Sequence, residues 1–512
     1  MHKLTENREQ LRTVTLDDFV DLNNPVRILD NIINEVIDKG NIEIPTGKNR
    51  FGRRAFSAND LVKLYIYGYI NGITSCRALE KAARVNIEII WLIKGQNPSY
   101  KTISDFRKNN PLFIKEVFQK SIALLMDKEL IDNRTWVLDG HKVKGNAKRD
   151  MISVKKLRKQ VLETEEQIEQ LMKELTDERS NSEDDDDPEG NASNSRKLSK
   201  LIESRDNNQS LISVVESKGQ QFISPTDKDA LLLKTRRGKC AGFNTQIVVD
   251  GTHHLIVGVD LADVSADSRS LYSVIKSTSD AIKVKPATVL ADRGYTNFQD
   301  IRKVYEEITN SVIVMLQQAS RDKSGLAFKY DSDNDHVICP RGNVMKYKGK
   351  ALVRGIFYYA YQCKVCNVCP IRKSCTKSKE GRIYRISENR YFIEMYKELM
   401  RREDSLKTMK RRKTIVEHVF GTMDQMMHYN GFKLRGRAKV KTELYLYSLA
   451  YNMKRLFKLL SSPQPGDMIG KLRLSGFKNA LLSHFSLFYE LLRLISDCFT
   501  YKMQPIAKFP TS

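Results

Sequence analysis

Hydrophobic positions along the first quarter of the chain follow helical spacing. Within residues 26–37, and again behind the N-cap residue Ser57, apolar residues recur at steps of three and four. Asn71-Gly72 ends the second of these helices. Further helices, separated by tight turns, are predicted at residues 77–84, 87–93 and 100–109.

Short helices joined by tight turns are compatible with a helix-turn-helix domain that binds DNA. Lys101, Arg107 and Lys108 lie on the last predicted helix and are compatible with such a domain. A plain helical bundle with a basic surface is the alternative.

From Thr135 onward, strand patterns alternate with helix patterns. A β-rich run at 135–141 ends on an acid and a glycine, Asp139-Gly140. Strands are then predicted at 243–250, 255–264, 287–290 and 311–316, and helices at 268–282 and 298–306. The order indicates a mixed α/β layer, in which sites collect at the carboxyl ends of strands.

Residues 150–220 interrupt this layer. Apolar residues from Val154 to Leu175 keep a coiled-coil-like spacing, and the run Ser182–Asp187 is acidic. We expect a helical hairpin, inserted between two strands, whose acidic tip is solvated and disordered.

A helix beginning near Arg411 buries Ile415, Val416 and Val419 on one face and carries Glu417. Basic residues surround this acid: Lys410, Arg411, Arg412 and Lys413 precede it, and Lys433, Arg435, Arg437, Lys439 and Lys441 follow it. A carboxylate beside many cations suits a divalent metal ion and a phosphate in one place. A solvated charge on an amphipathic helix is the simpler interpretation of Glu417 alone.

Three acids therefore form the candidate site: Asp139, Asp292 and Glu417. Asp292 ends a short apolar strand, as Asp139 ends an earlier one. Three carboxylates offer the hard oxygen ligands that Mg²⁺ prefers, and two such ions support in-line phosphoryl displacement. Taken singly, each aspartate is also explained as a turn or strand-end residue.

The charge balance agrees with a polyanionic partner. The 512 residues include 86 Lys and Arg against 62 Asp and Glu, a net charge of +24. The length allows two or three domains. A membrane surface is the rival partner, but no apolar run approaches the roughly 18 residues of a membrane span. The polar N-terminus lacks an apolar signal core, so we expect a cytosolic protein.

Five of the eight cysteines cluster in one segment: Cys339, Cys363, Cys366, Cys369 and Cys375. Two-residue spacing suits a tetrahedral metal, and Cys339-Pro-Arg-Gly resembles a zinc-knuckle turn. Structural zinc held by four of the five, reduced thiols without metal, and an iron–sulfur cluster all stay open. The other cysteines are isolated and are expected to be ordinary buried thiols.

At the three acids the chain resembles the DDE transposases of bacterial insertion sequences, which are built on a ribonuclease-H-like fold. Val137–Ala147 resembles the first-acid segment of that family, Leu290–Tyr295 the second, and Ile415–Gly421, continued through Leu434–Arg437 and Leu449–Arg455, the third. Residues 56–109 resemble the N-terminal helical domain of one branch. The family's Tyr-Arg-Glu-Lys signature is altered here, because Lys410, Lys413 and Asp424 occupy its Tyr, Arg and Lys positions.

The resemblance implies an α/β, ribonuclease-H-like sheet with inserted segments, preceded by an all-α N-terminal domain. The expected divisions are a lead-in at 1–50, helical DNA-binding domain at 51–130, catalytic domain at 131–460 with insertions at 150–220 and 330–380, and linker and helix at 461–512.

The same resemblance implies cut-and-paste movement of a DNA element by a bacterial, cytoplasmic, nucleoid-associated enzyme. Asp139, Asp292 and Glu417 would hold two Mg²⁺ or Mn²⁺ ions. The partners would be double-stranded DNA, as terminal inverted repeats and target, and a second subunit in a homodimer. The residues expected to bind DNA are Lys410, Arg412, Lys413, Arg435 and Arg437.

Three other functions remain as alternatives. A metal-dependent nuclease on the same fold would cut DNA without joining it. An inactive, transposase-derived DNA-binding protein would fit the altered signature at Asp424. A scaffold at a membrane surface would use the coiled coil and the basic charge.

Overall fold

The contacts of the chain divide it into two compact units in the computed structural model. The first comprises Met1–Asp132, His141–Ser265 and His418–Ser512, and the second Asn133–Gly140 and Ala266–Glu417. The residues that the structure describes are 14–45, 56–147, 151–181, 188–235, 238–316, 327–331, 333–353, 356–428 and 430–460. The expected linker and helix at 461–512 lie outside them.

Helices fill the N-terminal part of the first unit. Local capping explains where several begin, because the side chains of Asn24, Ser75, Asn86 and Ser99 each accept a hydrogen bond from a backbone N–H in the first turn. All five helices predicted here are present, and α6 was not predicted. The helices are η1 (Leu16–Phe19), α1 (Pro25–Gly40), α2 (Ala58–Ile70), α3 (Cys76–Val85), α4 (Ile87–Leu92), α5 (Tyr100–Asn109) and α6 (Pro111–Asp127).

These helices share a core with α14 (Arg437–Leu460), which comes from the far end of the described chain. Helix α14 packs against α2, α5, α6 and strand β6 (Ile256–Leu261), and most of its residues are buried. A helix surrounded on all sides must be apolar almost all round. The ring of Tyr447 on α14 stacks on Tyr69 of α2 with centroids 4.1 Å apart.

One buried ion pair joins α5 to α14. The Arg107 guanidinium is 4% exposed, lies 3.5 Å from the Glu443 carboxylate and donates to the Tyr69 hydroxyl at 2.8 Å. Glu443 is fully buried and also accepts the backbone N–H groups of Lys433 and Leu434. Arg107 is therefore a core residue and does not contribute to a basic surface on α5. Lys101 and Lys108 of the same helix are exposed.

The central sheet has the strand order β4-β5-β1-β7-β8, and β6 also pairs with β5. Strands β7 and β8 continue β1 in parallel, whereas β4 and β6 are antiparallel to β5. Strand β1 contributes residues to both units. The expected mixed α/β sheet, preceded by a helical region, is confirmed. Its remaining strands are β1 (Thr135–Lys144), β4 (Leu231–Thr235), β5 (Gly238–Asp250), β7 (Thr288–Ala291) and β8 (Val312–Val314).

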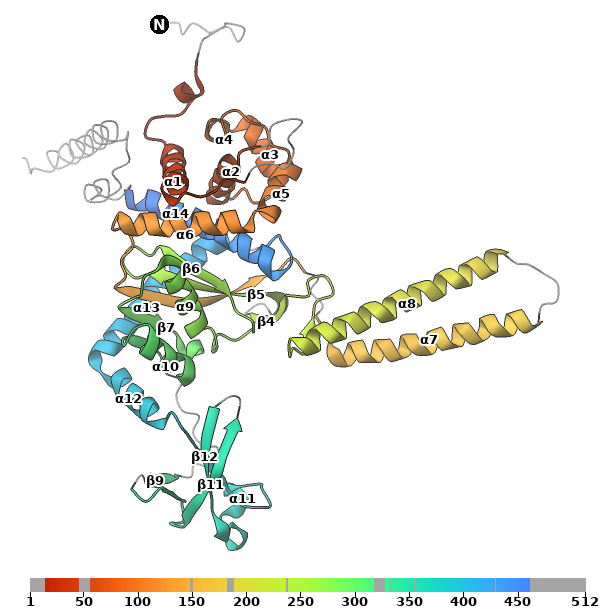
Figure 1. Ribbon diagram of the computed structural model, residues 1–512, viewed down its shortest axis with the longest axis vertical. Coiled ribbons are helices and arrows are strands. Elements are labelled where there is room, and N and C mark those ends of the chain that lie inside the picture. The colour runs from red at the N-terminus through yellow and green to blue at the C-terminus, as the bar shows by residue number, and fades with distance from the viewer. Residues whose placement is uncertain are drawn as a thin grey trace, which may run out of the picture. The chain divides into compact units, whose positions relative to one another are not determined.

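The insertion after β1 is the expected helical hairpin. Helices α7 (Val154–Asn181) and α8 (Pro188–Ser217) run side by side (Figure 1). At its base, β2 (Ile152–Ser153) pairs with β3 (Phe222–Ile223), and Leu157, Leu211 and Val215 form a small apolar cluster. The acidic run at 182–187 lies outside the described residues.

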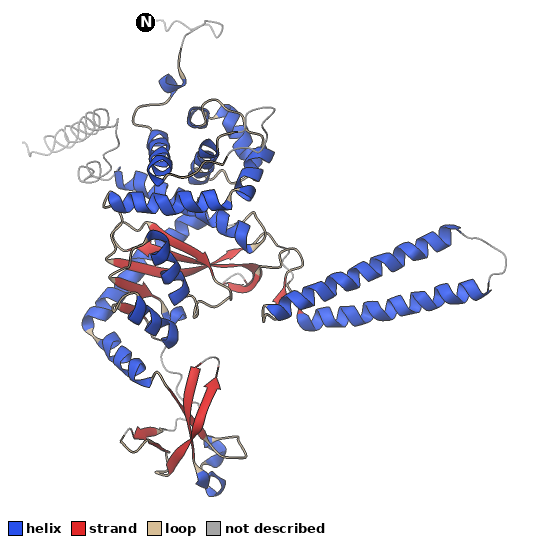
Figure 2. Ribbon diagram, in the orientation of Figure 1, coloured by secondary structure: helices blue, strands red, loops and turns tan. Residues whose placement is uncertain are grey.

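The second unit adds helices and a small separate sheet, seen in red in Figure 2. Antiparallel strands of this sheet follow the order β13-β12-β11-β10-β9 and were not predicted. No helix in the described ranges is long and apolar enough to span a membrane. The elements are α9 (Leu271–Ile282), η2 (Arg293–Tyr295), α10 (Phe298–Glu307), β9 (Lys329–Asp331), β10 (His336–Ile338), β11 (Val344–Val353), β12 (Ile356–Gln362), η3 (Lys364–Val368), α11 (Arg372–Cys375), β13 (Ile383–Ser387), α12 (Arg390–Arg401) and α13 (Glu403–Met426), which continues into the first unit.

We predict that Arg107→Ala lowers the free energy of unfolding by about 3–5 kcal/mol, the usual cost of leaving one buried charge without its partner. Urea denaturation followed by circular dichroism measures the change. Lys108→Ala, one residue away and exposed, is the control and should change stability by less than about 0.5 kcal/mol. Equal stabilities of the two variants would contradict the buried pair.

Candidate active site

Strands β1 and β7 place two of the three predicted acids side by side. In their parallel register, Leu138 is the partner of Ala291, and each is followed directly by an acid, Asp139 or Asp292. Asp292 stands at the carboxyl end of β7, as expected. Asp139 does not end its strand, because β1 continues to Lys144 after its pairing with the shorter β7 has stopped.

The Asp139 carboxylate is largely buried and neutralised by an arginine. Its Oδ2 accepts Nη1 of Arg412 at 2.7 Å, with 18% of the Asp139 and 13% of the Arg412 side chain exposed. Its Oδ1 accepts the backbone N–H of Gly140 at 2.8 Å. Burial raises the pKa of Asp139; the Arg412 guanidinium opposes this, and the neighbouring Asp292 carboxylate adds to it.

The Asp292 side chain accepts a hydrogen bond within its own loop. Its Oδ1 accepts the backbone N–H of Gly294 at 2.7 Å and so caps η2. A Cβ atom added at Gly294 would lie 2.9 Å from Asp292 Oδ1 and 3.3 Å from Asp267 Oδ2. The glycine therefore leaves room for two carboxylates.

Asp267 is a nearby acid that the sequence analysis missed. Burial raises the pKa of Tyr295, and Asp267, Asp139 and Asp292 add to the shift in that order, so all three carboxylates lie near this buried ring. Asp267 lies in the loop before α9, outside any periodic element. Its one signal in the sequence is its place just ahead of that helix.

The third predicted acid, Glu417, lies on the exposed face of α13. Lys410, Lys413 and Glu417 are spaced by three and four residues, share one side of the helix and are all exposed. Ile415, Val416, Val419 and Met423 are buried on the opposite side, so the predicted amphipathic helix is confirmed. It begins earlier than expected, at Glu403.

The donor types at the candidate site fit a divalent metal ion in part. Asp139 and Asp292 are adjacent carboxylates, and an ion between them would relieve their mutual repulsion. In the described part of the chain, however, no three His, Cys, Asp or Glu side chains are arranged as ligands of a single ion. The structure thus brings the two aspartates together and leaves Glu417 facing solvent.

Asp424, the altered signature residue, has a partner. Its Oδ1 lies 2.9 Å from Nε2 of His141, and the two side chains are 29% and 27% exposed. The His141 ring also stacks on Phe420, with centroids 4.9 Å apart. The Asp424 carboxylate therefore forms an intramolecular contact between α13 and the second half of β1.

The side chains predicted to bind DNA differ in whether other groups of the protein already engage them. Arg437 lies 3.2 Å from the Asp263 carboxylate and donates to the carbonyls of Leu261 and Ala262. Nε of Arg435 donates to the Asn146 carbonyl at 2.6 Å. Lys410 and Lys413 project into solvent, and Arg412 is engaged by Asp139 as described above.

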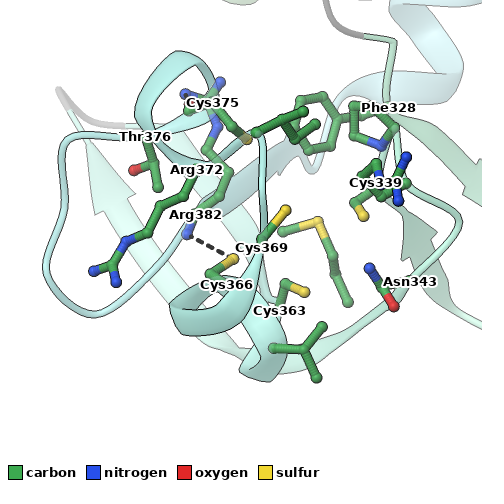
Figure 3. A pocket seen from close by; sticks show the side chains of 15 residues that line it. Phe328, Cys339, Asn343, Cys363, Cys366, Cys369, Arg372, Cys375, Thr376 and Arg382 are labelled. Atoms are coloured by element: carbon green, nitrogen blue, oxygen red, sulfur yellow. Dashed lines mark hydrogen bonds between the residues drawn. The ribbon is translucent and has the colours of Figure 1, made fainter.

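The structure also brings the five clustered cysteines together. Cys339, Cys363, Cys366, Cys369 and Cys375 are free thiols that line one small cavity of about 20 Å³ (Figure 3). Strands β11 and β12 explain this, since the start of β11 lies beside the end of β12 through the pair Lys346 and Gln362. Segments far apart in sequence thereby meet at one end of the small sheet.

Comparison with known proteins gives two family matches. Residues 14–109 match the model described as "Transposase domain (DUF772)", and residues 338–457 match the model described as "Transposase DDE domain". The second match includes Glu417 and begins after both aspartates. No curated protein matches the sequence. One solved structure is similar, a cryo-EM structure of the piggyBac transposase synaptic complex with hairpin DNA. The sequence identity is 8% and the TM-score is 0.22, and the alignment covers 88% of this chain and 82% of that chain.

We predict that Arg412→Gln destabilises the protein by about 1–3 kcal/mol, because the Asp139 carboxylate stays buried without its charged donor. Urea denaturation provides the measurement. Lys413→Gln, the exposed neighbour, should be close to neutral.

A double-mutant cycle isolates the pair. Asp139→Asn combined with Arg412→Gln should lose less stability than the two single losses added together, since the amide needs no cation. Additive losses would show that Arg412 and Asp139 are not coupled.

Proposed function

We propose, from the premise that this chain is a DNA transposase of the DDE type, that it moves a DNA element by a cut-and-paste reaction. Hydrolysis would free the element ends, and strand transfer would join their 3′-hydroxyls to target DNA. The observation that carries the proposal is the adjacency of Asp139 and Asp292 on a ribonuclease-H-like sheet.

Asp139, Asp292 and Glu417 are the proposed catalytic acids. Transposases of this family generally use divalent metal ions, and we propose two Mg²⁺ or Mn²⁺ ions here. When bound, such ions supply an activated oxygen nucleophile and stabilise the departing oxygen. Asp139 and Asp292 would hold them from the sheet and Glu417 from α13. The second proposed metal is a structural Zn²⁺ ion at the cysteines.

The side chains around these acids have separate tasks. Arg412 compensates the buried charge of Asp139 in the free protein and would turn to a DNA phosphate when a metal ion takes over that role. Lys410 and Lys413 share the exposed side of α13 with Glu417, so DNA phosphates held by them would lie along the acid. Arg435 and Arg437 are proposed as further DNA contacts.

The proposed partners are terminal inverted repeats, target DNA and a second copy of the chain. Both ends of an element must be held together before strand transfer, so a homodimer is the smallest assembly that fits the reaction. The strongly basic composition supports binding to long stretches of DNA.

An inactive, DNA-binding relative is the second candidate. It is favoured by the contact of Asp424 with His141, which places a carboxylate where the family has a lysine. A nuclease that cuts without joining remains an outcome of the test below.

The test uses purified protein, Mg²⁺ or Mn²⁺, and labelled DNA from the regions flanking its own gene. We expect metal-dependent end cleavage and strand joining by the wild-type protein. Asp139→Asn, Asp292→Asn and Glu417→Gln should each lose both activities by at least about a hundredfold while still binding DNA. Glu403→Gln, an exposed acid on the same helix, is the matched control and should keep both.

Each pattern of products decides between the candidates. Cleavage without joining would identify a nuclease. Binding without cleavage by any of the proteins would identify an inactive binder. Full activity of Glu417→Gln would remove that residue from the catalytic set.

We predict that Asp424→Lys tightens DNA binding. The exchange replaces a negative charge by a positive one, so the dependence of log K on log salt should steepen by about one unit if the new ammonium contacts a phosphate. Fluorescence anisotropy at several salt concentrations measures this slope. Glu403→Lys makes the same charge change elsewhere on α13, and an equal effect there would show that position 424 has no special role.

A further inference from the structure

The cysteine cluster sits at one end of the small five-stranded sheet, where two separate segments meet. Cys339 begins the turn between β10 and β11, whose backbone is closed by hydrogen bonds from Cys339 N–H to the Asn343 carbonyl and from Gly342 N–H to the Cys339 carbonyl. Gly342 has a φ of +78°, which favours glycine in this turn. The other four cysteines follow β12 in η3 and α11.

The small sheet has little core of its own. Its described core cluster consists of Val337, Met345, Tyr361, Cys363 and Cys366, so two of these buried residues are cysteines. Exposed apolar side chains such as Leu352 and Val368 add nothing to the interior. A module with so small a core normally needs a disulfide or a metal ion to hold it. All five cysteines of the cluster are free, which leaves the metal.

The five thiols are not equivalent. Cys363 is 4% exposed within the apolar cluster, the lowest exposure among the five thiols. It packs as a core residue at the end of β12.

The remaining four thiols act on one another electrostatically. Cys375 lies close to Cys366, Cys369 and Cys339 at the cavity that the cysteines line. The backbone N–H of Arg382 points to Sγ of Cys366 at 3.5 Å, as the dashed line in Figure 3 shows. A donor aimed at sulfur stabilises a thiolate there.

The neighbouring glycine keeps this sulfur accessible. A Cβ atom at Gly381, whose φ is +91°, would lie 2.9 Å from Cβ and 3.2 Å from Sγ of Cys366. Any larger residue would therefore displace Cys366 from the cavity. The position requires glycine both for its backbone and for the space beside the thiol.

We propose that this segment binds one structural zinc ion through Cys339, Cys366, Cys369 and Cys375, and that Cys363 remains a core thiol. The four sulfurs provide the tetrahedral set that Zn²⁺ takes in structural sites, with the two-residue spacing between Cys366 and Cys369 typical of such sites. In the described ranges no three of these thiols are at ligand spacing, so binding of the ion would draw the four sulfurs together in the cavity that they line.

The ion joins the β10–β11 turn to the segment after β12 and so fixes the ends of the β11–β12 ribbon. This zinc site stabilises the fold. Its sulfur ligands differ from the oxygen ligands proposed for the catalytic ions. Its presence does not depend on whether the chain joins DNA.

The test measures zinc and iron in the full-length protein by inductively coupled plasma mass spectrometry after growth with both metals. We expect about one zinc per chain in the wild-type protein and in Cys363→Ser. Cys369→Ser and Cys375→Ser should retain less than about a tenth of that zinc. Cys240→Ser, outside the cluster, should keep all of it.

A second readout covers variants that fold poorly. Replacement of zinc by Co²⁺ in the wild-type protein should produce the visible absorption bands of tetrahedral thiolate coordination, unchanged in Cys363→Ser. Loss of zinc from Cys363→Ser with retention in Cys375→Ser would overturn the assignment of ligands. Iron in place of zinc, or no metal together with five freely titrating thiols, would overturn the site itself.

Discussion

The parallel pairing of β1 with β7 is the interaction on which the candidate site depends. It sets Leu138 against Ala291, and the two residues that follow are both aspartates. Strand β7 ends there while β1 continues, so Asp139 lies just past the last residue of β1 that pairs with β7. Adjacent carboxylates repel each other, and the protein meets that cost with one guanidinium, that of Arg412.

Helix α13 has a buried apolar side and an exposed charged side. Its buried side includes Val416 and Val419. Its exposed side carries Lys410, Lys413 and Glu417. The contact of Asp424 with His141 then fixes the helix against β1. An element held this firmly can present an acid to solvent without losing its position.

The N-terminal helices are held by a core that they do not build alone. Helix α14 supplies the apolar surface against which α2, α5 and α6 pack, and the Arg107–Glu443 pair lies inside that contact. A fully buried carboxylate is tolerated because a guanidinium and two backbone N–H groups surround it. The N-terminal helices, strand β6 and α14 therefore belong to one folded unit.

The local sequence pattern was enough to predict many of the helices and strands of this protein. Apolar spacing and caps determined α1 to α5, the α7–α8 hairpin, strands β1, β5, β6, β7 and β8 with helices α9 and α10, and the two faces of α13. Strands β2, β3 and β4 were not predicted. These features follow from periodicity and from side chains that bond to neighbouring backbone groups. The acids at 139 and 292 were also found from the sequence, since each directly follows a run of buried β residues.

Only the tertiary structure decided which charged groups meet. Arg107 and Arg412 look alike in the sequence as basic residues on helices, yet one is buried against Glu443 and the other neutralises Asp139. Asp267 is marked in the sequence only by its place ahead of α9, and its position beside Asp292 depends on how the loop before that helix folds. The small sheet around the cysteines was likewise not predicted, because its short strands alternate weakly and gain their order from pairing with one another. Contacts between segments far apart in the chain depend on tertiary packing. The local hydrophobic pattern of either segment does not indicate which other segment it will contact.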